Sequence, residues 1–320
     1  MSSIFSLASL VIALDKTLYS YKFVNGSAQE TAVRILSAPW MTRLWTLQEA
    51  ALAKNLAFLM NGILTDMAFI RDCVIRGTRC PILMRFGVTM NLLAMGGKKL
   101  NPAEALFAAS GRASSKLGDE TIAVAPMIGV DVDALLATEP EERMGKFWRT
   151  LGVIPSGVLF VGGKKLEERG LRWAPRGFGE AEILLKGGEA RITMEGLKGE
   201  WFVFTFKERV KMEVGVFYGL HDCTGEDQGS CDGRLHLCLN FISHGEPRLC
   251  DALAFKESPA PGDPDLYGVA LLMEDGAGEE EVFRYGGGVF AMDFRNLVVD
   301  PRRVKALVKA RGEMKKICVS

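Results

Sequence analysis

The sequence has no excess of charge of either sign. Its 39 Lys and Arg residues are matched by 39 Asp and Glu residues, so the formal net charge of the 320-residue chain is zero. A chain without net charge has no long-range field that attracts nucleic acid or anionic lipid. We therefore expect no DNA partner. Because 48% of the residues are hydrophobic, the chain has enough apolar side chains to fold around a core.

Long hydrophobic runs are also missing. The longest apolar stretches, residues 7–14 and 121–130, are well short of the roughly 20 residues that a membrane-spanning helix needs. Residues 4–14 resemble the core of a secretion signal, but no Lys or Arg precedes them and no clear cleavage site follows. The sequence therefore predicts a cytoplasmic protein without a membrane span.

Histidine is scarce, and cysteine is present in an odd number. The chain has three His and seven Cys, a pattern typical of reduced thiols rather than of a disulfide framework. No local signature of a Ser-His-Asp or Cys-His site is present, which gives little support to a hydrolase. Most of these residues gather between positions 221 and 250: His221, Cys223, Cys231, His236, Cys238, His244 and Cys250.

The spacing of this cluster argues against a metal site. Zinc sites usually contain pairs such as Cys-x2-Cys, whereas the closest pairs here are His221-x-Cys223 and His236-x-Cys238. His236 and Cys238 also alternate with leucines, which is typical of a strand with one buried face. We therefore predict no metal ion and no cofactor, and a zinc-dependent binding module is the weakest hypothesis.

The composition changes once, near residue 152. Before this point, capped amphipathic segments predict helices. Asn101 and Glu104 form the cap of one helix, and Asp119 with Glu120 begins another. A further helix should end at Gly152, because Gly readily adopts the left-handed conformation that closes a helix.

After residue 152, short runs rich in Val, Ile and aromatic residues alternate with glycine turns, as strands require. The turn at residues 186–189 predicts a hairpin, which makes this region mainly antiparallel. From Asp300 onward we expect a helix with an apolar stripe of Val304, Leu307 and Val308 beside many Lys and Arg residues. The expected strands are residues 157–162, 183–185, 190–192, 200–206, 212–219, 235–243, 267–274 and 287–294.

Near the N-terminus, two apolar runs at residues 10–14 and 56–60 flank a helical segment at about residues 42–54. This order predicts a βαβ unit with parallel strands that are buried on both faces. A parallel sheet normally needs more than two strands. We therefore expect the last part of a larger α/β domain, either in a truncated protein or in a fragment of a longer one.

Together these patterns predict an α+β fold in four parts. We expect a partial α/β unit at residues 1–62, a helical segment at 63–152, a β-rich and mainly antiparallel domain at 153–299, and a basic helix at 300–320. The basic face of the last helix is interpreted as a solvated surface rather than as a site for nucleic acid or lipid.

Several stretches then point to a known family. Residues 7–15 and 37–50, which include RLWTLQE at 43–49, resemble the last third of the fungal heterokaryon incompatibility (HET) domain. Residues 112–122 and GLRWAPR at 170–176 resemble segments that commonly follow this domain, so the resemblance covers roughly residues 1–180. The motif residues are Arg43, Trp45, Thr46, Leu47, Gln48, Glu49, Arg172, Trp173 and Pro175.

The resemblance implies a fold similar to the Toll/interleukin-1 receptor (TIR) domain, whose enzymatic members cleave NAD with a glutamate. Glu49 stands at the place of that glutamate. Independently, the spacing of Trp45, Glu49, Leu52 and Leu56 places the carboxylate beside the indole on the apolar side of a helix. There Glu49 would stabilise positive charge on a ribose as nicotinamide leaves. Alternatively, Glu49 pairs with Arg43 or another basic residue at the edge of the sheet.

The first two blocks of the HET domain have no counterpart before Met1. Because catalysis needs a preformed cleft that orients the substrate, the sequence favours an interaction or regulatory module over an enzyme. The resemblance implies a role in fungal non-self recognition and programmed cell death signalling, with protein partners or self-association. The alternative function is a NAD-cleaving effector that uses Glu49, with NAD as its substrate.

Two Gly-Gly-Lys-Lys turns occur at residues 95–100 and 161–166. Neither fits the spacing of a P-loop or of a dinucleotide-binding fingerprint. We interpret both as simple turns.

Overall fold

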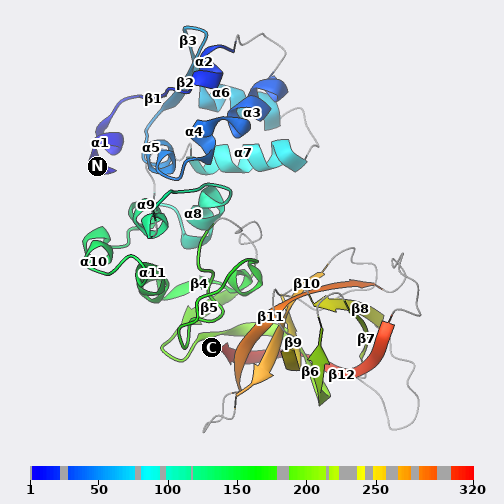
Figure 1. The fold of residues 1–320 in the computed structure, drawn as a ribbon. Coiled ribbons are helices and arrows are strands. Elements are labelled where there is room, and N and C mark those ends of the chain that lie inside the picture. Colours follow the sequence, from blue (N-terminus) through cyan, green and yellow to red (C-terminus); the bar gives the residue numbers. More distant parts are fainter. Residues whose placement is uncertain are drawn as a thin grey trace. The chain divides into compact units, whose positions relative to one another are not determined.

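The computed structural model describes two compact units (Figure 1). The N-terminal unit consists of Met1–Leu151 and Gly177–Leu185, and the sheet unit consists of Gly152–Arg176 and Lys186–Ser320. The described residues are 2–21, 28–75, 81–93, 99–116, 118–178, 187–213, 216–222, 236–241, 248–256, 266–274, 281–293 and 304–320.

The predicted α+β class is confirmed. The division at Gly152 coincides with the change in composition, while the predicted parts 1–62 and 63–152 form one compact unit up to Leu151. No helix in these described ranges has the length and apolar character to cross a membrane.

The predicted βαβ unit is present in the N-terminal unit. Strand β1 (Val11–Ala13) pairs in parallel with β2 (Leu56–Met60). A third strand, β3 (Ile63–Asp66), pairs antiparallel with β2 and was not expected. The turn between them is Asn61-Gly62, in which both residues have positive φ, 45° and 78°. This is the backbone that two-residue hairpins favour.

Helices α1 to α11 make up most of the rest of the N-terminal unit. Among the described residues, the crossover from β1 to β2 contains four helices, and six helices follow β3 in the same unit, which also includes the terminal helix α1. Their bounds are α1 (Ser2–Leu7), α2 (Lys16–Tyr19), α3 (Ala28–Ser37), α4 (Pro39–Thr42), α5 (Thr46–Ala51), α6 (Met67–Ile75), α7 (Pro81–Leu93), α8 (Pro102–Ala109), α9 (Asp119–Ile128), α10 (Val132–Leu136) and α11 (Arg143–Leu151).

The predicted helix ends are confirmed where the side chains can cap. Asn101 Oδ1 accepts a hydrogen bond from the backbone N–H of Glu104 at 2.9 Å. The Glu104 carboxylate in turn accepts one from the backbone N–H of Asn101 at 2.8 Å. Gly152 follows α11 with a φ of 69°, the left-handed conformation expected for a terminating glycine.

The two faces of the small sheet differ, which the sequence did not predict. On the inner face, Ala13, Phe58 and Thr65 pair across the three strands and are all nearly inaccessible. The Trp40 ring packs edge-on against Phe58 with centroids 5.3 Å apart. This face therefore belongs to the core of the unit.

The opposite face is only partly covered, because Ala57 is buried there and its neighbours are exposed or half-buried. Ile12 pairs with Ala57, which shares its face with Leu59, and Leu59 pairs with Leu64. Ile12 and Leu64 are 44% and 48% exposed. Leu10 and Leu14, at alternate positions from Ile12, are also exposed. We call Leu10, Ile12, Leu14, Leu59 and Leu64 the outer face. The prediction that both faces are buried is wrong for it.

The sheet unit is β-rich and mainly antiparallel, as predicted, with parallel pairing only of β12 with β7 and β11 among the described strands. Strands β6 to β12 close on themselves in a ring, because β6 pairs with β12 as well as with β9 (Figure 1). The strands are β4 (Val153–Pro155), β5 (Glu189–Ile192), β6 (Leu197–Met212), β7 (Phe217–Asp222), β8 (His236–Phe241), β9 (Arg248–Phe255), β10 (Leu266–Met273), β11 (Val282–Asp293) and β12 (Val304–Val319).

The ring encloses a core rich in aromatic side chains. Phe204 contacts Phe255 edge-on with ring centroids 5.9 Å apart. This packing explains why the alternating Phe residues of β6 predict a strand correctly. The members of the core are Phe204, Phe206, Met212, Tyr218, Leu220, Leu239, Cys250, Leu253, Phe255, Ala270, Val289 and Ala310.

The predicted C-terminal basic helix is wrong. Val304–Val319 forms β12, and Ala310 to Val319 pair antiparallel with β6 from Phe206 to Leu197. The stripe of Val304, Leu307 and Val308 fits a helical period, but the same segment also alternates apolar and polar residues with a period of two. Pairing with β6 satisfies the backbone of this segment and decides in favour of the strand.

A second correction concerns residues 157–162, which were expected to form a strand. Ser156–Phe160 forms a short 3₁₀ helix, η1, and all five of its residues are buried. A short buried apolar run cannot be assigned to strand or helix from its periodicity alone. The predicted hairpin arm at 183–185 lies outside the described residues.

Candidate functional site

The structure brings two of the resembling segments together in the N-terminal unit. Arg43 and Ala113 form a parallel bridge, flanked by a hydrogen bond from Leu44 N–H to the Ala113 carbonyl at 3.0 Å. A second bond runs from Ala113 N–H to the Thr42 carbonyl at 2.8 Å. The RLWTLQE stretch at 43–49 is therefore held directly against the segment that begins at Arg112.

Helix α5 turns the motif side chains in different directions. Thr46, Leu47 and Gln48 are buried, whereas Trp45 is 37% exposed and Glu49 is half-buried. The apolar side of the helix is thus formed by Leu47 rather than by Trp45 and Glu49. The prediction that Glu49 lies on the apolar side is wrong, because the short helix packs through its neighbouring face.

Polar motif side chains bind the start of α9. The Gln48 amide donates to the carbonyls of Ile122 and Ala123, both at 3.0 Å. The Trp45 indole N–H donates to the Asp119 carboxylate at 3.0 Å, and the Ser114 hydroxyl donates to the same oxygen at 2.9 Å. Gln48 and Trp45 therefore fasten α5 to α9 and act as structural groups.

Arg112 is the buried cation of this site and was not singled out by the sequence. It is only 5% exposed. Its guanidinium donates to the carbonyls of Ala108 and Arg43 and to the Thr46 hydroxyl, each at 3.1 Å. Burial lowers the pKa of Arg112 to about 10, and the negative charge of Glu49 acts in the opposite direction. Glu49 is thus the anion whose charge acts on this cation.

Glu49 itself occupies the flank of α5. Within the described part of the chain, its carboxylate has no hydrogen bond and no ion pair shorter than 4 Å. Of the basic residues considered as its partner, Arg112 interacts with it electrostatically, whereas Arg43 is exposed. Among the polar side chains of RLWTLQE that lie on α5, Glu49 is the one left available for a ligand.

A second carboxylate, Glu120, lies in the first turn of α9. It accepts a hydrogen bond from Phe178 N–H at 2.8 Å. Phe178 packs with Phe147 and Trp148, with ring centroids 5.3 and 6.1 Å from its own. Burial raises the pKa of Glu120 although the Phe178 bond opposes this. The sequence named Glu120 only as a helix start, and no local signal indicated its burial.

The third resembling segment, GLRWAPR, lies in the sheet unit. Trp173 and Pro175 are buried there, and the Trp173 indole donates to the Gly170 carbonyl at 2.9 Å. Arg172 forms an ion pair with Glu274 at 3.7 Å. These motif residues therefore stabilise a loop of the sheet unit.

Only part of the His and Cys cluster lies within the described residues. His221 lies directly opposite His236 in the β7–β8 ladder, and Cys250 is a buried thiol whose pKa burial raises to about 12. Cys223, Cys231 and His244 lie outside the described residues. No group of three or more potential ligands is found in the part that is described.

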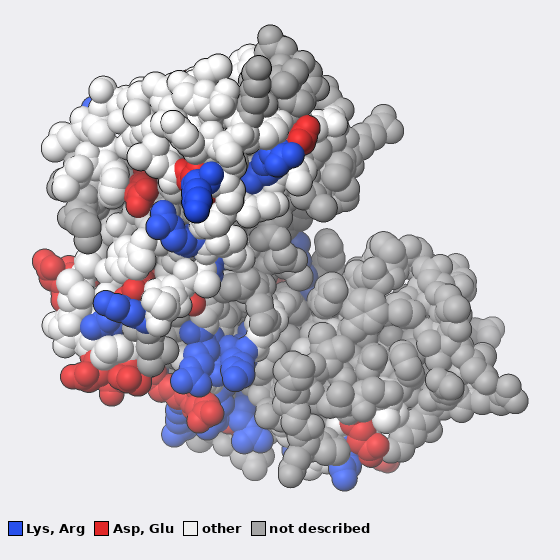
Figure 2. Space-filling view, turned by 45° about the horizontal axis from the view of Figure 1, so that its top comes forward, with Lys and Arg blue, Asp and Glu red and all other residues white. Residues whose placement is uncertain are grey.

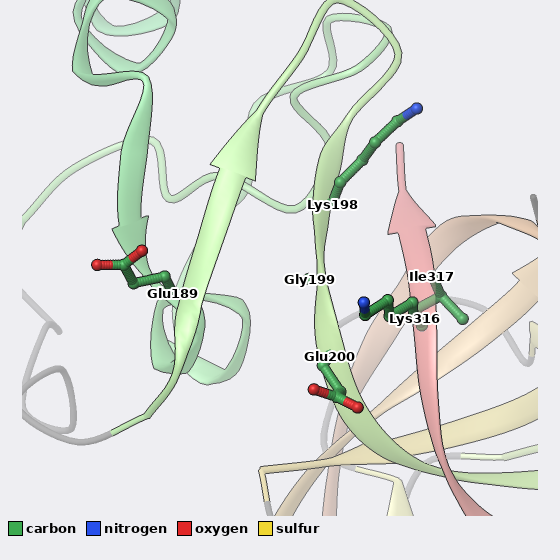
Figure 3. Close-up of a pocket in the computed structure, with 6 residues that line it drawn as sticks. All are labelled: Glu189, Lys198, Gly199, Glu200, Lys316 and Ile317. Carbon is green, nitrogen blue, oxygen red and sulfur yellow. The ribbon is translucent and has the colours of Figure 1, made fainter.

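The sheet unit also has an open groove of about 300 Å³ that the sequence did not indicate. Lys316 and Glu200 lie opposite each other across β12 and β6. Figure 3 shows the Lys198 side chain pointing away from Glu189, so the charged groups do not converge on one point. The groove is lined by Glu189, Lys198, Gly199, Glu200, Lys316 and Ile317.

Comparison with known proteins adds no relative. No protein-family model, curated protein or solved structure matches this chain.

Proposed function

We propose that this chain is a HET-domain-like protein of fungal non-self recognition and programmed cell death signalling. In this proposal it acts in the cytoplasm as an interaction or regulatory module rather than as an enzyme. The resemblance of residues 1–180 supports the family. The hydrogen bonds of Trp45 and Gln48 support the module, because these motif side chains hold the unit together instead of lining a cleft.

The observation that carries the interaction role is the outer face. Strands that pair in parallel are normally buried on both sides, and a contiguous apolar surface on a folded unit usually marks a contact site. Here Ile12, Leu14 and Leu64 are 44%, 65% and 48% exposed. Their burial against a partner would release water from apolar surface that the unit alone leaves wet.

The occupant that fits this face best is a second copy of the chain. The five side chains that define the face are apolar, and residues 1–14 contain no charged residue. One carboxylate, Asp66, lies on the same side of the sheet at the end of β3, opposite Ala57, and is exposed. Figure 2 shows separate small groups of Lys, Arg, Asp and Glu side chains among uncharged ones on the face of the molecule that it displays. Two copies that meet through the five apolar side chains, with Asp66 left at the rim in water, would bury no charge.

Self-association is tested by Ile12→Asp. We expect the wild-type chain to form a dimer in sedimentation equilibrium, and the variant to lose at least about tenfold in affinity, because a carboxylate would be buried without a partner. The matched control is Val33→Asp, since Val33 is equally exposed at 44% on α3, away from the sheet.

Two results would contradict this prediction. A wild-type chain that stays monomeric at its highest soluble concentration contradicts it, and so does an equal loss of affinity in both variants.

The same variants, expressed in a filamentous fungus, test the biological role. We expect the wild-type chain to change the frequency of growth arrest when incompatible strains fuse, and Ile12→Asp to abolish that change.

The available carboxylate of Glu49 favours one second function, cleavage of NAD. Purified protein would then release nicotinamide from NAD, and Glu49→Gln would abolish the release while the exposed control Glu141→Gln would not. An oxygen-to-nitrogen exchange preserves shape but removes the charge that stabilises a developing ribosyl cation. Release that survives Glu49→Gln removes this residue from the mechanism, and no release at any protein concentration excludes the function for this chain.

A further inference from the structure

The Gly-Gly-Lys-Lys turn of the sheet unit has a defined backbone. Residues 164–166 lie antiparallel to residues 174–176 around the bridge Lys165–Pro175. Arg176 N–H donates to the Lys164 carbonyl at 2.8 Å, and Leu166 N–H donates to the Ala174 carbonyl at 3.0 Å. Gly163 enters this pairing with a φ of 82°, which only glycine adopts readily.

This pairing places two cations side by side. Because Lys165 and Pro175 are bridge partners, Lys164 and Arg176 lie directly opposite each other on one face of the ladder. Both side chains are exposed. Like charges in such a pair destabilise a ladder. Neither side chain forms an ion pair with any residue that the structure describes, so no described acidic side chain relieves the repulsion.

The backbone next to these cations offers further donors. The N–H groups of Gly162, Gly163 and Lys164 have no hydrogen-bond acceptor within the described residues. Gly162 and Gly163 are exposed and carry no side chain that would shield these groups. Consecutive backbone N–H groups in a turn with a left-handed residue form a concave anion-binding arrangement.

The other basic side chains of the loop are already engaged. The Lys165 ammonium donates to the Val161 carbonyl at 2.6 Å and lies 5.0 Å from the centre of the Tyr285 ring. Arg172 pairs with Glu274. These contacts and the buried Trp173 hold the loop in place, so Lys164 and Arg176 are presented on a backbone that does not have to reorganise.

We propose that Lys164, Arg176 and the backbone N–H groups of residues 162–164 form a binding site for a phosphate group. An oxyanion with two negative charges would balance both cations and accept hydrogen bonds from these N–H groups. The Arg176 guanidinium can make a bidentate contact to a phosphate. The site is independent of the outer face and of Glu49. Free phosphate and a phosphorylated side chain of a partner present the same chemistry.

The test is a titration of the ¹⁵N-labelled full chain with inorganic phosphate, followed through the backbone amide signals. We expect saturable shifts at Gly162, Gly163 and Lys164, while chloride at equal ionic strength produces none. The double variant Lys164→Gln/Arg176→Gln should weaken binding at least about tenfold, since each charge-assisted hydrogen bond contributes about 1.5–3 kcal/mol.

The matched control is Lys207→Gln/Arg311→Gln, which removes the same charge from two exposed positions of β6 and β12. This control should bind phosphate as the wild type does. An equal loss in both double variants, or equal shifts with chloride, would show charge screening alone and overturn the proposal.

A second arm distinguishes the source of the phosphate. A phosphoserine peptide and its unphosphorylated form are titrated into the same samples. Tighter binding of the phosphopeptide than of inorganic phosphate identifies a modified protein as the ligand. Equal affinity for the phosphopeptide and for inorganic phosphate shows that the free ion is a sufficient ligand. Absence of shifts with every phosphate probe contradicts the site.

Discussion

Arg112→Ala is expected to lower the free energy of unfolding of the N-terminal unit by about 3 kcal/mol. The guanidinium joins three carbonyl or hydroxyl groups from α8, from the α4–α5 connection and from α5. It also lies 5.9 Å from the centre of the Trp40 ring. Its removal leaves the Ala108 and Arg43 carbonyls without this donor and opens a cavity beside Trp40.

Opposing effects decide the size of this loss. Burial lowers the pKa of Arg112 from 12.5 to about 10, so burying this cation costs about 3 kcal/mol, which the variant recovers. Against this, hydrogen bonds to a charged group contribute about 1.5–3 kcal/mol each, and truncation of a large buried side chain costs about 2–5 kcal/mol. The losses exceed the recovered cost.

Urea unfolding followed by tryptophan fluorescence measures the change. The control is Arg34→Ala on α3, where the ion pair with Glu30 is about half exposed and should contribute little to stability. If Arg112→Ala is as stable as Arg34→Ala, the cost of burying the charge equals the stabilisation from its hydrogen bonds and packing. Arg112 would then not be the link between the two resembling segments.

The sequence predicted the local features of the N-terminal unit well. The apolar runs of β1 and β2 and the cap formed by Asn101 and Glu104 depend on residues close together in the chain. The surroundings of Glu49 depend instead on Arg112, which lies 63 residues later in the chain. A helical wheel groups the residues of this helix by face, but it cannot show which of these faces packs against α9.

The closure of the sheet unit could not be predicted from the sequence, because it also depends on residues that are far apart in the chain. Segment 304–319 fits a helical stripe and a two-residue alternation about equally, and only its partner decides between them. That partner is β6, about a hundred residues earlier in the chain. Backbone pairing over ten positions, from Ala310 to Val319, then outweighs the weak helical preference of the segment.

Gly170→Ala is expected to destabilise the sheet unit by more than about 3 kcal/mol, since left-handed strain costs about 1–2 kcal/mol and a backbone clash adds to it. Gly170 has a φ of 79°, and a Cβ at this position would collide with the Met194 carbonyl oxygen. The Met194 carbonyl belongs to a turn that is closed by hydrogen bonds between Thr193 and Gly196, so it cannot move away freely.

The matched variant for this prediction is Gly152→Ala. Gly152 has a φ of 69°, but a Cβ there would meet no atom within 4 Å, so this variant carries only the conformational strain. The difference in unfolding free energy between the two variants therefore isolates the approach of Gly170 to Met194. Thermal unfolding followed by near-UV circular dichroism measures it, because the Trp173 indole is bonded to the Gly170 carbonyl. Equal losses in both variants would show that the turn around Met194 yields, and that GLRWAP requires its glycine for backbone conformation alone.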